Sequence, residues 1–88
     1  MKQSQMSKTE AAEIIVGQYN VCARKYGWTG KATKERIAIT ISEMIFESGN
    51  AFLVKAARVR PTDRYIMLVG KRMYGNSRPA RTTQTSFI

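Results

Sequence analysis

The clearest pattern of apolar and polar residues lies near the start of the chain and predicts a helix over about residues 7–26. Apolar residues repeat there at intervals of three or four, so they share one helical face. These residues are Ala11, Ile15, Tyr19, Cys22 and Tyr26. Ser7 and Glu10 have the spacing of a capping box, and Gly27 follows the last turn, where a left-handed glycine commonly ends a helix. Glycine destabilises the middle of a helix, so we expect Gly17 to mark a point where another helix approaches closely.

A second helix is predicted over about residues 33–48. Thr33 is a suitable N-cap, and Gly49 follows as a terminator. The residues on its apolar face are Ile37, Ile41, Met44, Ile45 and Ser48. The β-branched alternation over residues 37–41 is typical of a strand instead. The length of the segment and its end signals favour the helix.

Residues 51–74 allow two interpretations, divided at Pro61. In the first, Asn50 caps a short helix and Thr62 caps a second one that ends at Gly75. Phe52, Leu53, Ala56 and Ala57 would share a face of the former, and Ile66, Val69 and Met73 a face of the latter. In the second, the same segments are two strands joined by a Pro-Thr-Asp turn. We favour the helices, because neither segment alternates cleanly.

Together these elements predict a mainly α protein: an N-terminal helical hairpin followed by two short helices. The alternative is an α+β fold with a C-terminal β-hairpin. We expect a flexible N-terminus over residues 1–6, a single small domain over residues 7–75, and an extended, flexible and basic tail over residues 76–88. The tail lacks apolar periodicity and is rich in Ser and Thr.

The charge of the chain is concentrated in two blocks. The formal net charge is +9 on 88 residues. Residues 24–36 carry five basic residues against one acid, and residues 51–88 carry eight against one. The acids Glu43 and Glu47 lie between the blocks. Such an uneven surface repels itself, so it indicates a polyanionic partner.

Several classes of chemistry are disfavoured by composition. The chain has no histidine and one cysteine, which argues against His-based catalysis, Cys–His nucleophiles and the usual zinc sites. Glu10 and Glu13 are spaced to complement a helix dipole rather than to do chemistry. We therefore expect no catalytic residue, no metal, no cofactor and no enzymatic activity. With no disulfide pair, no signal-peptide pattern and no long apolar run, we expect a cytoplasmic location (host cytoplasm or virion if the chain is viral).

The first basic block combines cations with aromatic rings between the two long predicted helices. Lys25, Lys31 and Lys34 could neutralise phosphates while Trp28 stacks on a base. Equally, Trp28 could fill the end of the helix pair as a core residue. The tetrapeptide at residues 27–30 resembles the G-x-x-G loop of KH domains, which clamps a nucleic-acid backbone. No strand pattern precedes the first helix as that family requires, so we assign no family.

The second block is rich in arginine, whose planar guanidinium binds phosphate through two hydrogen bonds. Arg58, Arg60 and Arg64 surround Pro61 in both interpretations of residues 51–74 and form the preferred site. The alternative is a solvated turn in which Asp63 pairs with one of the arginines. The block also supplies the candidate phosphate contacts Arg72, Arg78 and Arg81.

These observations predict a small, non-enzymatic nucleic-acid-binding protein, DNA or RNA, that contacts phosphates largely without sequence specificity. The alternative is a structural or regulatory protein–protein component, such as a virion or particle subunit or a small inhibitor of a larger enzyme. A protein partner or a homo-oligomer would compensate for the small core. We do not expect a membrane partner.

Overall fold

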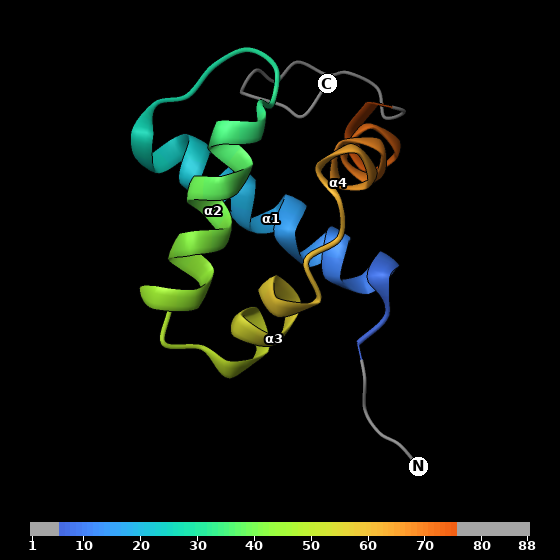
Figure 1. The fold of residues 1–88 in the computed structure, drawn as a ribbon. Helices are drawn as coiled ribbons and strands as arrows, with labels where there is room; N and C mark the ends of the chain where they lie inside the picture. Colours follow the sequence, from blue (N-terminus) through green and yellow to red (C-terminus); the bar gives the residue numbers. More distant parts are fainter. Residues whose placement is uncertain (1–5, 76–88) are drawn as a thin grey trace.

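The chain folds into helices throughout the part that the computed structural model describes, residues 6–75. The elements are α1 (Lys8–Tyr26), α2 (Lys34–Phe46), α3 (Ala51–Val59), α4 (Asp63–Gly70) and a π-helical turn, η1 (Lys71–Gly75). Figure 1 shows their arrangement. The mainly α prediction is confirmed, and the C-terminal β-hairpin is wrong because residues 6–75 contain no strand. The expected flexible segments, residues 1–6 and 76–88, lie outside the described residues apart from Met6.

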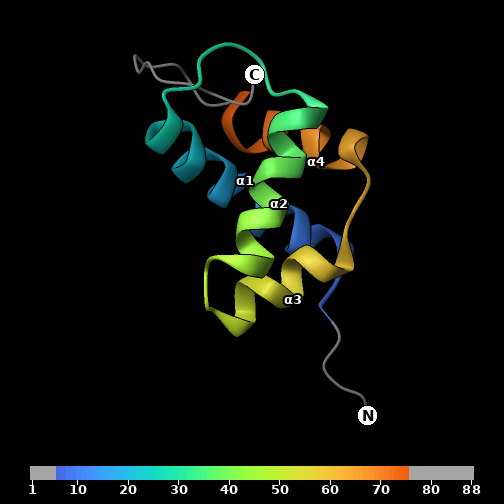
Figure 2. The ribbon, with the colours of Figure 1, turned by 60° about the vertical axis from the view of Figure 1, so that its left-hand side comes forward.

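Helix α1 is the element on which the others are assembled. It packs against α2, α3 and α4, and α2 also packs against α3. Figures 1 and 2 show α2 crossing in front of α1. Its buried face is a nearly continuous stripe, and the partner helices each contribute between two and four buried side chains. The core residues are Ala11, Ala12, Ile15, Val16, Tyr19, Ala23, Ile37, Ile41, Met44, Ala56, Ala57, Ile66 and Val69.

Every helix begins at a side-chain cap that the sequence predicts. The caps are Ser7, Thr33, Asn50 and Thr62, and each accepts a hydrogen bond from a backbone N–H of the first turn at 2.9–3.2 Å. Each cap satisfies a donor that the helix leaves unpaired, which stabilises a helix by about 1 kcal/mol. Gly27 ends α1 in the left-handed conformation with φ of 72°, also as predicted.

Small residues explain why the segment after Asn50 is a helix. Ala56 and Ala57 are buried, with 0% and 2% of their surface exposed, and they lie in the face that α3 presents to the core. Alanine has the highest helix propensity and allows close approach of two helices. The first turn of α4 follows after a three-residue connection, and its Ile66 and Val69 complete the core.

Some details of the predicted helices are wrong. Phe52 is 52% exposed rather than part of the buried face of α3. Met73 lies in the π-helical turn beyond α4 and is 40% exposed. Helix α2 ends at Phe46 rather than at residue 48, because the N–H groups of both Glu47 and Ser48 bond to the Glu43 carbonyl and close the last turn.

Gly17 does not mark the close helix contact expected of it. A Cβ built on Gly17 meets no atom within 4 Å in the structure. Gly17→Ala should therefore stabilise the fold by about 0.5–1 kcal/mol, because alanine restricts the unfolded chain and fits the helix. Such a gain would raise the Tm by several degrees in a chain of this size.

The matched control is Gly27→Ala. It makes the same chemical change at φ of 72°, where a side chain is strained by about 1–2 kcal/mol. Thermal and urea unfolding should give opposite signs for the two variants. Destabilisation by Gly17→Ala would show that α1 needs a glycine there.

Candidate nucleic-acid interface

The connection between α3 and α4 has an unusual backbone at Arg60. Arg60 caps the end of α3 with φ of 48° and is the single non-glycine residue with positive φ among residues 6–75. A glycine would adopt this conformation without strain. The Arg60 side chain is held locally, because its guanidinium donates to the Pro61 carbonyl at 3.0 Å and to Asp63 Oδ1 at 3.2 Å. Asp63 therefore pairs with one of the three arginines, as the alternative interpretation of this turn predicts.

The other two arginines of the preferred site are free of such partners. Arg58 lies in the last turn of α3 and Arg64 in the first turn of α4, on opposite sides of buried Pro61. Both are exposed, and neither makes an ion pair within residues 6–75. The structure therefore gives this turn one arginine engaged by an acid and two available to an anion.

Trp28 fills the end of the α1–α2 pair, as the core interpretation of this residue predicts. It is partly buried and packs against the core. Its ring centroid lies 5.4 Å from those of both Tyr19 and Tyr26. The Arg36 guanidinium carbon lies 5.4 Å from the Trp28 ring centroid, and Arg36 also donates to the Thr29 carbonyl at 2.8 Å. A nucleic-acid base could stack on the face of the Trp28 ring that Arg36 covers only if the Arg36 side chain moved away.

Glu43, in the last turn of α2, connects this helix to the end of α1. Its carboxylate accepts hydrogen bonds from the Tyr26 hydroxyl and, at 3.2 Å, from the Lys25 ammonium. These donors, Tyr26 first, lower the pKa of Glu43, and Glu43 in turn raises the pKa of Lys25 and of Tyr26. Lys25, a candidate phosphate contact, is therefore already paired with an acid in this structure.

The Cys22 thiol lies beside the same carboxylate. Its sulfur is 3.9 Å from Glu43 Oε1, and 2% of the residue is exposed. Burial raises the pKa of Cys22, so little thiolate is present at neutral pH. A buried, protonated thiol is a poor nucleophile, so we interpret Cys22 as a structural residue.

The remaining candidates lie in three places. Lys31 is in the α1–α2 loop, Lys34 begins α2 and Arg72 is in η1, and all three are exposed without an ion pair among residues 6–75. Arg78 and Arg81 lie outside the described residues. Two further cations, Lys55 on α3 and Lys71 in η1, are exposed in the same way although they were not selected from the sequence. Their position in the arginine-rich block was the available signal.

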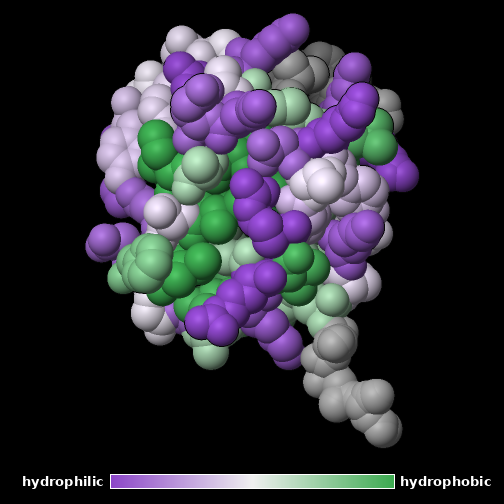
Figure 3. All heavy atoms as spheres, in the orientation of Figure 1, coloured by the Kyte–Doolittle hydropathy of each residue, from purple (hydrophilic) through white to green (hydrophobic). Residues whose placement is uncertain are grey.

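The face of the molecule drawn in Figure 3 carries many hydrophilic side chains. Figure 3 shows hydrophilic side chains over the α1–α2 loop, over the α3–α4 connection and over α3, with apolar surface between α2 and α3. In the described part of the chain, no three His, Cys, Asp or Glu side chains are grouped to hold a metal ion. Among the same residues, no helix combines the length and apolar character that crossing a bilayer requires.

Comparisons of the chain with protein-family models, with curated proteins and with solved structures find no match.

The Glu43 contacts predict a pH-dependent stability. Because the folded pKa of Glu43 is lowered, its contribution is complete above about pH 5 and is lost as the pH falls through that pKa. Glu43→Gln should therefore destabilise the protein at neutral pH, and its deficit relative to the wild type should shrink below about pH 4. Urea unfolding at several pH values measures this difference.

Glu47→Gln is the control, because Glu47 is exposed and makes no ion pair within residues 6–75. It should cost less stability at neutral pH than Glu43→Gln. Equal effects of the two variants would contradict a specific role for Glu43.

Proposed function

We propose that this protein binds nucleic acid through its phosphates, without enzymatic activity and largely without sequence specificity. The observation that supports this most directly is the set of exposed cations with no acid partner in residues 6–75. Those that follow α1 in the chain are Lys31, Lys34, Lys55, Arg58, Arg64, Lys71 and Arg72. Unpaired cations repel one another and do not stabilise the fold. A bound polyanion would neutralise them.

The turn around Pro61 is the proposed centre of this interface. Arg58 and Arg64 extend from two helices at either end of a short connection, so they can reach neighbouring phosphates on one strand. Guanidinium groups bind phosphate oxygens in a bidentate manner, which favours arginine at this point. Lys31, Lys34 and Arg72 extend the contact, and Arg60 joins once it leaves Asp63. We place this activity in the cytoplasm, because the single cysteine gives no sign of an oxidising compartment.

A second function, that of a structural or regulatory protein–protein component, is favoured by a different observation. Phe46, at the end of α2, is 78% exposed and Phe52, at the start of α3, is 52% exposed. Large apolar side chains on either side of one turn are typical of a protein contact. Sedimentation after nuclease treatment separates the two functions: self-association that survives without nucleic acid, and is lost in Phe46→Ser, favours assembly.

The contribution of Arg58 and Arg64 can be measured separately. Arg58→Ala and Arg64→Ala should each make the slope of log affinity against log salt less steep by about one unit, because each removes one phosphate contact. Anisotropy titrations of a labelled duplex at several salt concentrations give this slope.

Arg24→Ala makes the same change on α1, outside the proposed site, and should leave the slope unchanged. If all three variants reduce the slope equally, the charge acts without a defined site, and the proposed turn is wrong.

Asp63 should compete with phosphate for Arg60. Asp63→Asn removes a partly exposed ion pair worth about 0.2–1 kcal/mol, so affinity should rise by up to about fivefold. The gain should disappear in an Arg60→Ala background, as a double-mutant cycle would show. Glu47→Gln changes the net charge by the same amount away from Arg60, and it should raise affinity less. Equal gains would assign the effect to net charge alone.

A further inference from the structure

Helix α4 has a buried side and an uncovered side. Ile66, Val69 and Gly70 are buried, and α4 packs mainly against α1. On the outer side, Leu68 is 52% exposed. Figure 1 shows α4 at the edge of the molecule.

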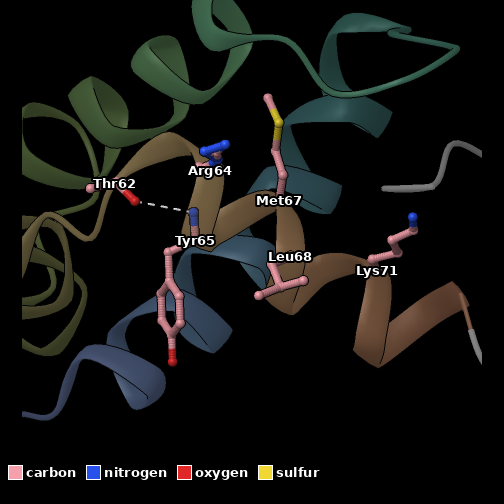
Figure 4. A pocket seen from close by; sticks show the side chains of 6 residues that line it. All are labelled: Thr62, Arg64, Tyr65, Met67, Leu68 and Lys71. Carbon is pink, nitrogen blue, oxygen red and sulfur yellow. Dashed lines mark hydrogen bonds between the residues drawn. The ribbon is translucent and has the colours of Figure 1, made fainter.

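The uncovered side contains a shallow pocket of about 490 Å³. It is lined by Thr62, Arg64, Tyr65, Met67, Leu68 and Lys71, and most of its lining surface is apolar. In Figure 4, Tyr65 and Leu68 point to one side of the helix while Arg64 and Met67 point to the other. The pocket therefore has the form of an apolar channel between two rows of side chains.

The wall formed by Tyr65 is held in place by α1. The Tyr65 hydroxyl shares a hydrogen bond of 2.7 Å with the Thr9 hydroxyl, and the Lys8 ammonium lies 5.6 Å from the Tyr65 ring centroid. A wall fixed in this way loses little freedom when a partner binds, which favours affinity.

The rim of this pocket is positive. Arg64 and Lys71 are exposed and make no ion pair within residues 6–75. Asp63, the acid nearest to the pocket in α4, is engaged with Arg60 at 3.2 Å. The surface thus combines an apolar floor with cations at two of its edges.

We propose that this face of α4 binds an acidic amphipathic helix of another protein. Apolar residues spaced by three or four along that helix would fill the channel beside Leu68, and its flanking Asp or Glu side chains would pair with Arg64 and Lys71. Charge complementarity selects this occupant. A second copy would bring another cationic α4 face, and residues 76–88 contain two arginines and no acid.

The proposal does not depend on nucleic-acid binding, although the two share Arg64. An acidic helix on α4 would occupy one guanidinium of the proposed phosphate site. Partner binding and nucleic-acid binding are therefore expected to weaken one another.

A synthetic peptide tests the proposal with the full-length chain. The probe is a fluorescein-labelled 15-residue peptide with leucines at positions i, i+3, i+4 and i+7 and glutamates on both flanks. The control peptide has the same composition, with the leucines scrambled so that no apolar stripe forms. The amphipathic peptide should bind at least ten times more tightly than the control.

Two protein variants locate the binding. Leu68→Asp should weaken binding of the amphipathic peptide at least tenfold, whereas Phe46→Asp should change it less than twofold, although Phe46 is more exposed. Circular dichroism confirms that each variant is folded, and Leu68→Gln replaces Leu68→Asp if the latter is not.

Three results would overturn the proposal. Equal binding of the two peptides would show attraction by charge alone, and equal loss in the two variants would place the peptide elsewhere. Self-association of the wild type that is lost in Leu68→Asp would assign the face to a second copy. Tighter peptide binding by Phe87→Ser would assign it to residues 76–88.

Discussion

The burial of one face of α1 is the interaction on which the rest of this structure depends. α1 contacts each of the other three α-helices, and it contributes more residues to the core than any other helix. The partner helices are short, and helices of eight to thirteen residues are marginal in isolation. Their stability comes from the apolar surface that each buries against α1, with a side-chain cap at each start to define where it begins.

The buried core around α1 also determines where the charged side chains lie. Charged side chains are excluded from the interior of a small core, so the cations occupy helix ends, connections and outer faces. The two basic blocks include the α1–α2 loop and the α3–α4 connection. Within them the structure distinguishes cations used internally from those that remain available. Lys25 and Arg60 are paired with acids, and Arg36 covers Trp28, whereas Arg58 and Arg64 have no such role.

The features that could be predicted from the sequence are those that depend on residues close to one another in the chain. The caps at Ser7, Thr33, Asn50 and Thr62 depend on a few neighbouring residues, and the periodicity of α1 on a single face. What could not be predicted depends on contacts between segments distant in sequence. The exposure of Phe52, the open space beside Gly17 and the pairing of Glu43 with Tyr26 follow from how helices cross, which no spacing reveals. The pairing of Asp63 with one of the arginines around Pro61 is local and could be foreseen as an alternative, but the sequence does not show that the partner is Arg60.

The central claim is that available cations on this surface bind phosphates, and the salt dependence of wild-type binding tests it most directly. Affinity for a labelled duplex is measured by anisotropy between about 50 and 200 mM salt, where counterion release dominates. With about six phosphates engaged, the slope of log affinity against log salt should be near −5. A flat response, or no binding at low salt, would contradict the account.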